Sequence, residues 1–81
     1  MTYADVIAIR LNQLCKERGI SRNKLATQSG ITQSTLEYLM LGKTKNVTLK
    51  TLHMVAKGLD MTVSELLDFP ELDTTLFDNE D

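Results

Sequence analysis

Glycine repeatedly follows short stretches in which apolar residues have helical spacing. These regularly placed helix ends are the strongest constraint on the fold. Gly19, Gly30 and Gly42 each end such a stretch, where glycine readily adopts the left-handed conformation of a helix C-cap. Ser21 and Thr32 follow the first two glycines, and both residue types are good helix N-caps. Alternating β-branched runs are few, so the sequence predicts an all-α fold.

Five short helices are expected in the first 68 residues. Thr62 and Glu65 form the T-x-x-E capping box of the last one, and Pro70 marks its end. The connections between the helices are short, so the helices are expected to pack as one compact domain, followed by an acidic C-terminal tail at 69–81. The predicted helices run from about 3 to 18, 22 to 29, 33 to 41 and 49 to 59, and the fifth follows Thr62 and ends before Pro70.

The apolar residues of the longest predicted helices lie on one face and predict the core. The first helix contributes one such stripe and the fourth helix another. These residues are Ile7, Leu11, Leu14, Cys15, Leu52, Val55, Ala56 and Leu59.

Charge is strongly segregated along the chain, although the formal net charge is only −2. Residues 1–58 hold all nine basic residues and three acidic ones, a net charge of +6. Residues 59–81 hold no basic residue and eight acidic ones, a net charge of −8. A basic body with an acidic tail suggests a polyanionic partner for the body.

Several classes of protein are disfavoured by what the sequence lacks. No stretch approaches the roughly 20 apolar residues of a membrane-spanning helix, and the N-terminus has no basic region with a cleavage site, so a cytoplasmic protein is expected. The single cysteine, Cys15, excludes an internal disulfide, and His53 is the only histidine. We therefore expect no metal and no cofactor. Neither a pair of carboxylates in a polar pocket nor a phosphate-binding glycine loop is apparent, so an enzyme is not expected.

The spacing within residues 22–41 is the most specific functional signal. Ala26 lies four positions before Gly30, and Leu36 and Leu39 lie six and nine positions after it. A small residue at 26 allows close helix crossing, and glycine at 30 allows positive φ in the turn. The apolar residues fill the angle between the two helices, which leaves an outer face composed of Gln33, Ser34, Glu37, Tyr38 and Leu41.

The segments RNKLATQSGITQSTLEYLMLGKTKN and TLKTLHMVAKGLDMTVSELL resemble the Cro/Xre-type, lambda-repressor-like family of helix-turn-helix proteins. The resemblance covers roughly residues 5–68. It implies a compact five-helix DNA-binding domain whose third helix enters the major groove of double-stranded DNA. It further implies a transcriptional regulator, most often a repressor, that binds a pseudo-palindromic operator.

Carried over by position, the resemblance assigns base reading to the polar face at 32–38. Gln33 is the strongest candidate because its amide can bond to adenine N6 and N7 together. Ser34 and Tyr38 are further base readers, and Thr32 could contact a thymine methyl group or a phosphate. Glu37 could accept from cytosine N4 or repel phosphates. Taken alone, such a face is more often merely solvated.

Phosphate contacts are expected from residues that flank the third helix. Ser21 and Arg22 begin the second helix, where unpaired N–H groups favour an anion. In the family, the loop after the third helix follows the DNA backbone, and Thr35 could add a hydroxyl contact. Lys24 and Lys50 are weaker candidates. The predicted phosphate-contacting residues are Ser21, Arg22, Thr35, Lys43, Lys45 and Asn46.

Two positions depart from the family pattern. Position 22 is often glutamine in relatives, so the bond to the first glutamine of the third helix is doubtful when arginine is there. Many relatives pair a glutamate and an arginine where this chain has Met40 and Cys15. Replacing both partners of a buried ion pair with apolar residues is often neutral or stabilising. We therefore predict that Cys15 and Met40 touch in the core.

The acidic end has three interpretations. Phe69, Leu72, Leu76 and Phe77 have helical spacing, so Pro70 could open a short amphipathic helix. This segment could be a solvated tail, could pack through these apolar residues on the body or, with the fifth helix, on a second subunit, or could compete with DNA for the basic face. We favour the homodimer because it matches a pseudo-palindromic operator. The alternative function is an antitoxin or adaptor whose main partner is another protein, with DNA binding for autoregulation.

Overall fold

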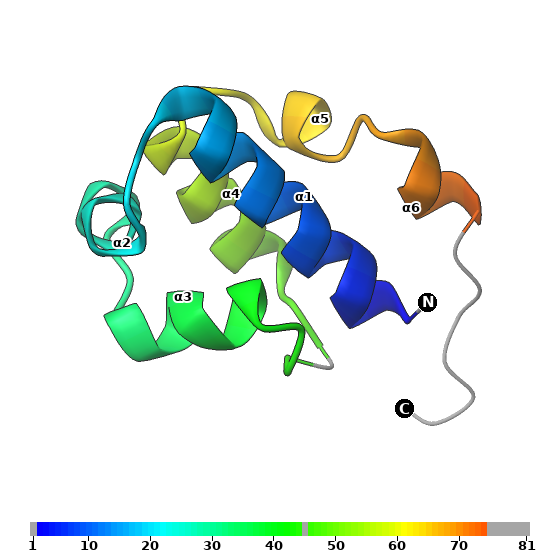
Figure 1. The fold of residues 1–81 in the computed structure, drawn as a ribbon, viewed down its shortest axis with the longest axis horizontal. Helices are drawn as coiled ribbons and strands as arrows, with labels where there is room; N and C mark the ends of the chain where they lie inside the picture. The colour runs from blue at the N-terminus through cyan, green and yellow to red at the C-terminus, as the bar shows by residue number, and fades with distance from the viewer. Residues whose placement is uncertain (1, 45, 75–81) are drawn as a thin grey trace.

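The computed structural model describes residues 2–44 and 46–74, which form six helices and no strand (Figure 1). The five helices expected up to residue 68 are all present within a residue or two, apart from the end of the fifth. The expected total of five helices was wrong, since a sixth follows. The helices are α1 (Tyr3–Arg18), α2 (Arg22–Ser29), α3 (Gln33–Met40), α4 (Leu49–Gly58), α5 (Val63–Leu66) and α6 (Pro70–Thr74).

Local capping explains where these helices begin and end. In each of α1 to α5 a serine or threonine N-cap accepts a hydrogen bond from the backbone N–H three residues later. Gly19 and Gly30 adopt left-handed φ values of 61° and 73° after α1 and α2, a conformation that a β-carbon would strain. The predicted capping box of Thr62 and Glu65 is confirmed. The N-caps Ser21, Thr32 and Thr62 and the C-caps Gly19 and Gly30 are therefore the residues that the sequence predicted at these helix ends.

The sixth helix arises because proline is well suited to the first position of a helix. Pro70 begins α6 rather than ending α5, which stops at Leu66. Phe69 is buried in the core, and Leu72 is partly buried against it. The short helix considered for this segment is thus present over Pro70–Thr74, while Leu76 and Phe77 lie outside the described residues. The division into a domain at 1–68 and a tail at 69–81 remains a prediction.

The core contains every residue that the helical spacing placed on the inner faces of the first and fourth helices. Cys15 and Met40 are both buried in this cluster, with 7% and 5% of their surface exposed. Their direct contact remains a prediction. Burial raises the pKa of the Cys15 thiol, against a smaller lowering by the charge of Arg22. A buried thiol with a raised pKa has little nucleophilic thiolate, which fits a packing role for Cys15.

Side chains of α1 donate hydrogen bonds to backbone carbonyls of α3 and α5. The Arg10 guanidinium donates from Nε to the Leu66 carbonyl at 2.9 Å and from Nη2 to the Glu65 carbonyl at 2.8 Å. It also lies over the Phe69 ring, 5.3 Å from the ring centre. Asn12 Nδ2 donates to the Met40 carbonyl at 2.9 Å, which ties α1 to the end of α3. Arg10 therefore holds the C-terminal helices against α1.

Helices α2 and α4 approach so closely that glycine is required between them. A β-carbon on Gly58 would collide with Ser29 Oγ and would lie 3.0 Å from the Ser29 backbone nitrogen. It would also lie 3.1 Å from a methyl carbon of Leu25.

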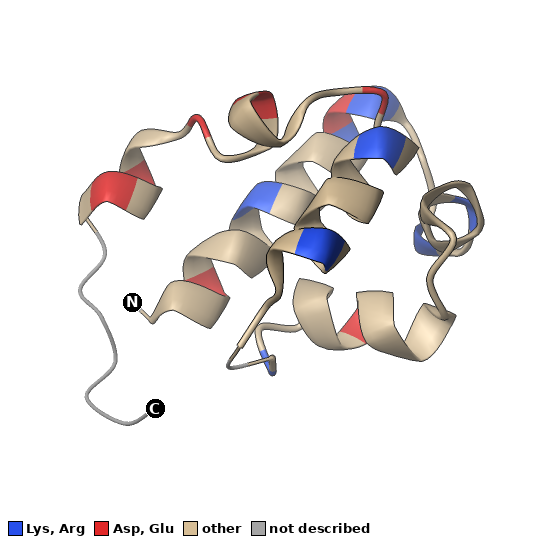
Figure 2. Ribbon diagram, turned by 180° about the vertical axis from the view of Figure 1, so that it is seen from behind, with Lys and Arg blue, Asp and Glu red and all other residues tan. Residues whose placement is uncertain are grey.

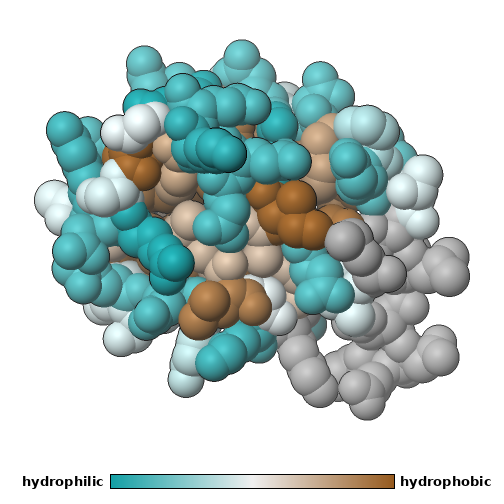
Figure 3. All heavy atoms as spheres, viewed as in Figure 1, coloured by the Kyte–Doolittle hydropathy of each residue, from teal (hydrophilic) through white to brown (hydrophobic). Residues whose placement is uncertain are grey.

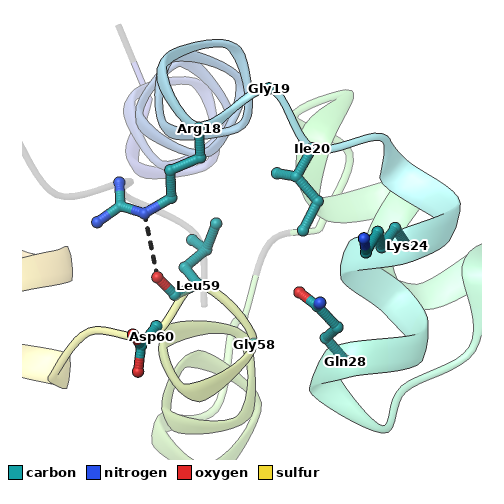
Figure 4. A pocket seen from close by; sticks show the side chains of 8 residues that line it. All are labelled: Arg18, Gly19, Ile20, Lys24, Gln28, Gly58, Leu59 and Asp60. Carbon is teal, nitrogen blue, oxygen red and sulfur yellow. Dashed lines mark hydrogen bonds between the residues drawn. The ribbon is translucent and has the colours of Figure 1, made fainter.

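Beside this contact, the ends of α1 and α4 and the flank of α2 surround an open cavity of about 290 Å³ (Figure 4). Arg18 Nε donates to the Leu59 carbonyl there at 3.1 Å.

Candidate nucleic-acid interface

Helix α3 lies along one edge of the molecule, with α1 and α2 packed on one side of it (Figure 1). Its apolar residues Leu36, Leu39 and Met40 are buried in the core. The predicted outer face is exposed, as is the N-cap that precedes it. The exposed residues are Thr32, Gln33, Ser34, Thr35, Glu37, Tyr38 and Leu41. The helix therefore has one buried face and one polar face that is open to a partner.

The two threonines at the start of α3 are engaged with each other. Thr32 Oγ1 accepts from the Thr35 backbone N–H at 3.1 Å and donates to Thr35 Oγ1 at 2.9 Å. The Thr32 hydroxyl is thus used for capping, whereas the Thr35 hydroxyl still has its own proton to donate. Ser21 plays a similar role in α2, where its Oγ accepts from the Lys24 N–H at 3.1 Å.

The best candidates for base reading have no competing partner. The side chains of Gln33, Ser34 and Tyr38 make no hydrogen bond to any other residue in the described ranges, and 59% of the Tyr38 surface is exposed. Because all three polar groups face solvent, they are able to bond to an incoming base edge or phosphate without breaking a bond within the protein.

A polar corner links the start of α2 to α3. Arg22 Nη1 lies 4.0 Å from Glu37 Oε1, and a small pocket of about 120 Å³ is lined by Arg22, Asn23, Gln33 and Glu37. Arg22 makes no hydrogen bond to Gln33 among the described residues. Asn23 had not been predicted as a site residue. Its position directly after the first residue of a capped helix is the signal that could have identified it.

Basic residues surround α3 without occurring in it (Figure 2). Glu37 is the one charged residue of α3, while Arg22 and Lys24 lie on α2 and Lys50 on α4. The loop that follows α3 carries Lys43 and Asn46, both exposed, whereas Lys45 lies outside the described residues.

The start of this loop is fixed to the body of the protein. The Lys43 N–H donates to the Tyr38 carbonyl at 3.0 Å. Gly42 has a positive φ of 72° and lies so close to α1 that a β-carbon would be 3.3 Å from Asp5 Oδ1. The backbone at Lys43 is therefore held at the end of α3.

Apolar atoms are also exposed next to this edge. Figure 3 shows them among hydrophilic atoms over α1 and near the end of α3. Ile9 is 39% exposed and Leu41 is 49% exposed. Together with Ala8 and Met40 they help to line a groove of about 420 Å³ between the two helices.

The sequence of residues 10–71 matches the family of Cro/C1-type helix-turn-helix DNA-binding domains, so the chain belongs to this family. The family is one of DNA-binding domains rather than an enzyme family. The resemblance inferred from the helix-turn-helix spacing is thereby confirmed, as is the all-α fold.

Solved structures of related regulators agree with this assignment. The restriction-modification controller protein C.AhdI from Aeromonas hydrophila is 32% identical, with a TM-score of 0.69 over 78% of this chain and 97% of that one. SinR, solved in a complex with SinI, is 32% identical, with a TM-score of 0.71 over 91% of this chain and 69% of that one. The prophage Lp1 protein 11 is 27% identical, with a TM-score of 0.75 over 86% and 92% of the two chains.

Other comparisons and searches gave negative results. No curated protein matches the sequence. Within the described ranges, no helix is long and apolar enough to cross a membrane. The same residues contain no group of three or more histidine, cysteine, aspartate or glutamate side chains arranged to hold a metal ion.

Proposed function

We propose that the protein is a sequence-specific transcriptional regulator that binds double-stranded DNA and acts as a repressor by blocking promoter access. The observation that carries the proposal is the division of α3, whose apolar side is buried while Gln33, Ser34 and Tyr38 are exposed and unpaired among the described residues. A helix presented in this way fits the major groove, where base edges differ in their donors and acceptors. A cytoplasmic location accords with this role.

The candidate contacts divide into base reading and phosphate binding. Gln33, Ser34 and Tyr38 are the proposed base readers, because their polar groups are available on the exposed face of α3. Thr32 is a weaker one, since its hydroxyl caps the helix. Glu37 is placed on the same exposed face.

The phosphate contacts are proposed to flank α3. Thr35 retains a hydroxyl proton to donate, and the α2 N-terminus offers backbone N–H groups. Contacts from several cations would make binding weaken steeply as salt increases. The proposed phosphate-contacting residues are Ser21, Arg22, Thr35, Lys43, Lys45 and Asn46.

Selection of bound sequences from random DNA at two salt concentrations tests this function. Gln33→Ala is expected to weaken binding to the selected site by about 5- to 150-fold, the loss of one bidentate base contact. Gln28→Ala is the matched control, because Gln28 is an exposed glutamine of α2 that lines the cavity beside α1 and α4. If the wild-type protein shows no sequence preference at either salt concentration, specific regulation is ruled out.

We also propose a homodimer formed through α5 and the acidic C-terminal segment, since two copies match an operator with two half-sites. Truncation after Thr74 tests the segment while keeping Phe69 and Leu72, which pack on the core. Loss of the dimer in sedimentation experiments would support an interface in 75–81. Tighter DNA binding by the truncated protein would instead support competition between the acidic residues and DNA.

A second candidate function is an antitoxin or adaptor whose main partner is another protein. It is favoured by the structural similarity to SinR, which was solved in a complex with SinI. Under this hypothesis the DNA site lies in the promoter of the protein's own gene, and a neighbouring gene encodes the partner. Co-expression of that gene product should yield a stable complex with altered DNA affinity. No complex and a site at unrelated promoters would contradict it.

A further inference from the structure

Arg22 and Glu37 form an ion pair between the two helices of the helix-turn-helix. Arg22 is the first residue of α2, and Glu37 lies in the middle of α3 on its exposed face. The side chains are 51% and 57% exposed, and their charged atoms are 4.0 Å apart. An exposed pair of this kind contributes little to stability, about 0–1 kcal/mol. Its position beside Gln33 therefore points to a role other than holding the helices together.

A carboxylate on a surface that receives DNA is unfavourable unless something offsets its charge. Glu37 is the only acidic residue of α2 and α3. Without Arg22 beside it, its negative charge would face the DNA phosphates with no paired positive charge. A guanidinium has five N–H donors in a rigid planar fork. The edge of Arg22 that contains Nη1 faces Glu37, which leaves donors on the rest of the fork for a second acceptor.

The geometry of the corner favours a phosphate as that acceptor. Arg22 lies at the N-terminus of α2, where the unpaired backbone N–H groups and the helix dipole attract an anion. Gln33 lines the same small pocket as Arg22 and Glu37. An arginine that is held between Glu37 and a phosphate would therefore connect the position of the DNA backbone to the glutamine proposed to read the adjacent base.

We propose that Glu37 is a positioning residue, which orients Arg22 toward one DNA phosphate and thereby fixes how α3 sits in the major groove. The inference rests on the proposed function and assigns Glu37 a role that works through Arg22. This role differs from the two other roles considered for Glu37, which are direct reading of a cytosine and simple repulsion of phosphates. The three roles predict different results when position 22 is changed.

A double-mutant cycle on the full chain tests the proposal. Arg22→Met, Glu37→Gln and the double variant are compared with wild type for binding to the selected duplex and to an unrelated duplex. With Arg22 present, Glu37→Gln is expected to lower the ratio of the two affinities by about three- to tenfold, a usual size for coupled contacts. With Met at 22, the same change should leave that ratio unaltered.

Modified DNA supplies a readout that a purely structural role would not affect. Duplexes with a single neutral methylphosphonate, placed in turn at each phosphate of a half-site, locate the phosphate bound by Arg22. The modification at that phosphate should weaken wild-type binding, weaken Glu37→Gln binding less, and leave Arg22→Met binding unchanged. Thermal unfolding followed by circular dichroism confirms that each variant is folded, which the exposure of both side chains favours.

Other outcomes would overturn the inference. An altered preference at one base position in both backgrounds would show that Glu37 reads a base. An equal gain of affinity for both duplexes in both backgrounds would show repulsion alone. If the wild-type protein binds specifically and Glu37→Gln has the same affinity ratio, the positioning role is wrong and the proposed function stands. Absence of any sequence preference in wild type would overturn both.

Discussion

Helix α2 meets its two neighbours in opposite ways. Toward α4 the contact is closed, because Gly58 leaves no room for a β-carbon beside Leu25 and Ser29. Toward α3 the corner is open, and the charged atoms of Arg22 and Glu37 lie 4.0 Å apart at the surface. The closed side gives α2 a fixed support on the core. The open side leaves polar groups available to a partner.

The comparison shows that a tightly packed side and an exposed polar side are separated within a single helix of eight residues. Tightly packed contacts tolerate little change in volume, since overpacking strains the neighbouring side chains and backbone. Exposed ion pairs tolerate substitution but respond to a new charge nearby. Changes on the closed side should therefore alter folding, and changes on the open side should alter binding.

The largest effect is expected from Gly58→Val. Its β-carbon would collide with Ser29 and crowd Leu25, so we expect the free energy of unfolding to fall by about 3 kcal/mol, the upper end of overpacking costs. Lys57→Val is the matched control, because it introduces the same residue at an exposed neighbouring position of α4. Urea denaturation measures both. Equal losses in the two variants would show that the contact between α2 and α4 is not tight.

A pair of arginine substitutions sharpens the comparison between packed and exposed sites. Arg10→Met removes two hydrogen bonds to the Glu65 and Leu66 carbonyls and the contact with the Phe69 ring. We expect it to lower the free energy of unfolding by about 2 kcal/mol. Arg22→Met should change stability by only about 0–1 kcal/mol while weakening DNA binding.

Thermal unfolding and DNA titration together check this pair. Arg10 should affect mainly the unfolding midpoint, and Arg22 mainly the affinity for DNA. If Arg22→Met destabilised the fold as much as Arg10→Met, the open corner would have to be regarded as part of the structural support.

Ser29→Ala should have a smaller effect of the opposite sign. Ser29 is buried on the closed side, and its Oγ has no hydrogen-bond partner within residues 2–44 and 46–74. A buried hydroxyl without a partner is unfavourable, and alanine also has a higher helix propensity. We expect a gain of about 0.5–1 kcal/mol, measured by urea denaturation. The exposed Ser34→Ala in α3 controls for propensity, and a marked loss in Ser29→Ala would indicate that the hydroxyl is satisfied in solution.

The smallest effect concerns the capping box of α5. Hydrogen bonds from the Thr62 backbone and then its side chain lower the pKa of Glu65 from its usual 4.5. Folding lowers the pKa of the Glu65 carboxyl below its value in the unfolded chain. The resulting stabilisation is therefore complete at a pH above the unfolded pKa. It is lost as the pH falls through the folded value. Glu65→Gln should therefore lower stability slightly at neutral pH and flatten its decline below about pH 4.5, the ordinary pKa of this group.

Thermal melts across this pH range measure the effect. Glu17→Gln is the control, since Glu17 is an exposed residue near the end of α1 that belongs to no capping box. An unchanged pH profile in Glu65→Gln would show that the box contributes nothing to stability in solution.

The sequence by itself determined the helices, their caps and most of the core. Each N-cap depends on residues within three positions of one another, and each apolar stripe depends on the helical period, so both are local properties. The polar face of α3 was visible for the same reason. The start of α6 was also local, yet the sequence left two roles open for Pro70, the end of the fifth helix and the start of a short one, because proline both stops one helix and starts another.

Only the tertiary structure decided which distant residues meet. It placed Gly58 against Ser29, Arg10 beneath the end of α5, and Arg22 beside Glu37. The sequence marks none of these pairs, because their members are 15 to 56 positions apart and come together only once the crossing of the helices is fixed. Periodicity shows which face of a helix is buried, but the packing of side chains determines which residue on the next helix it touches.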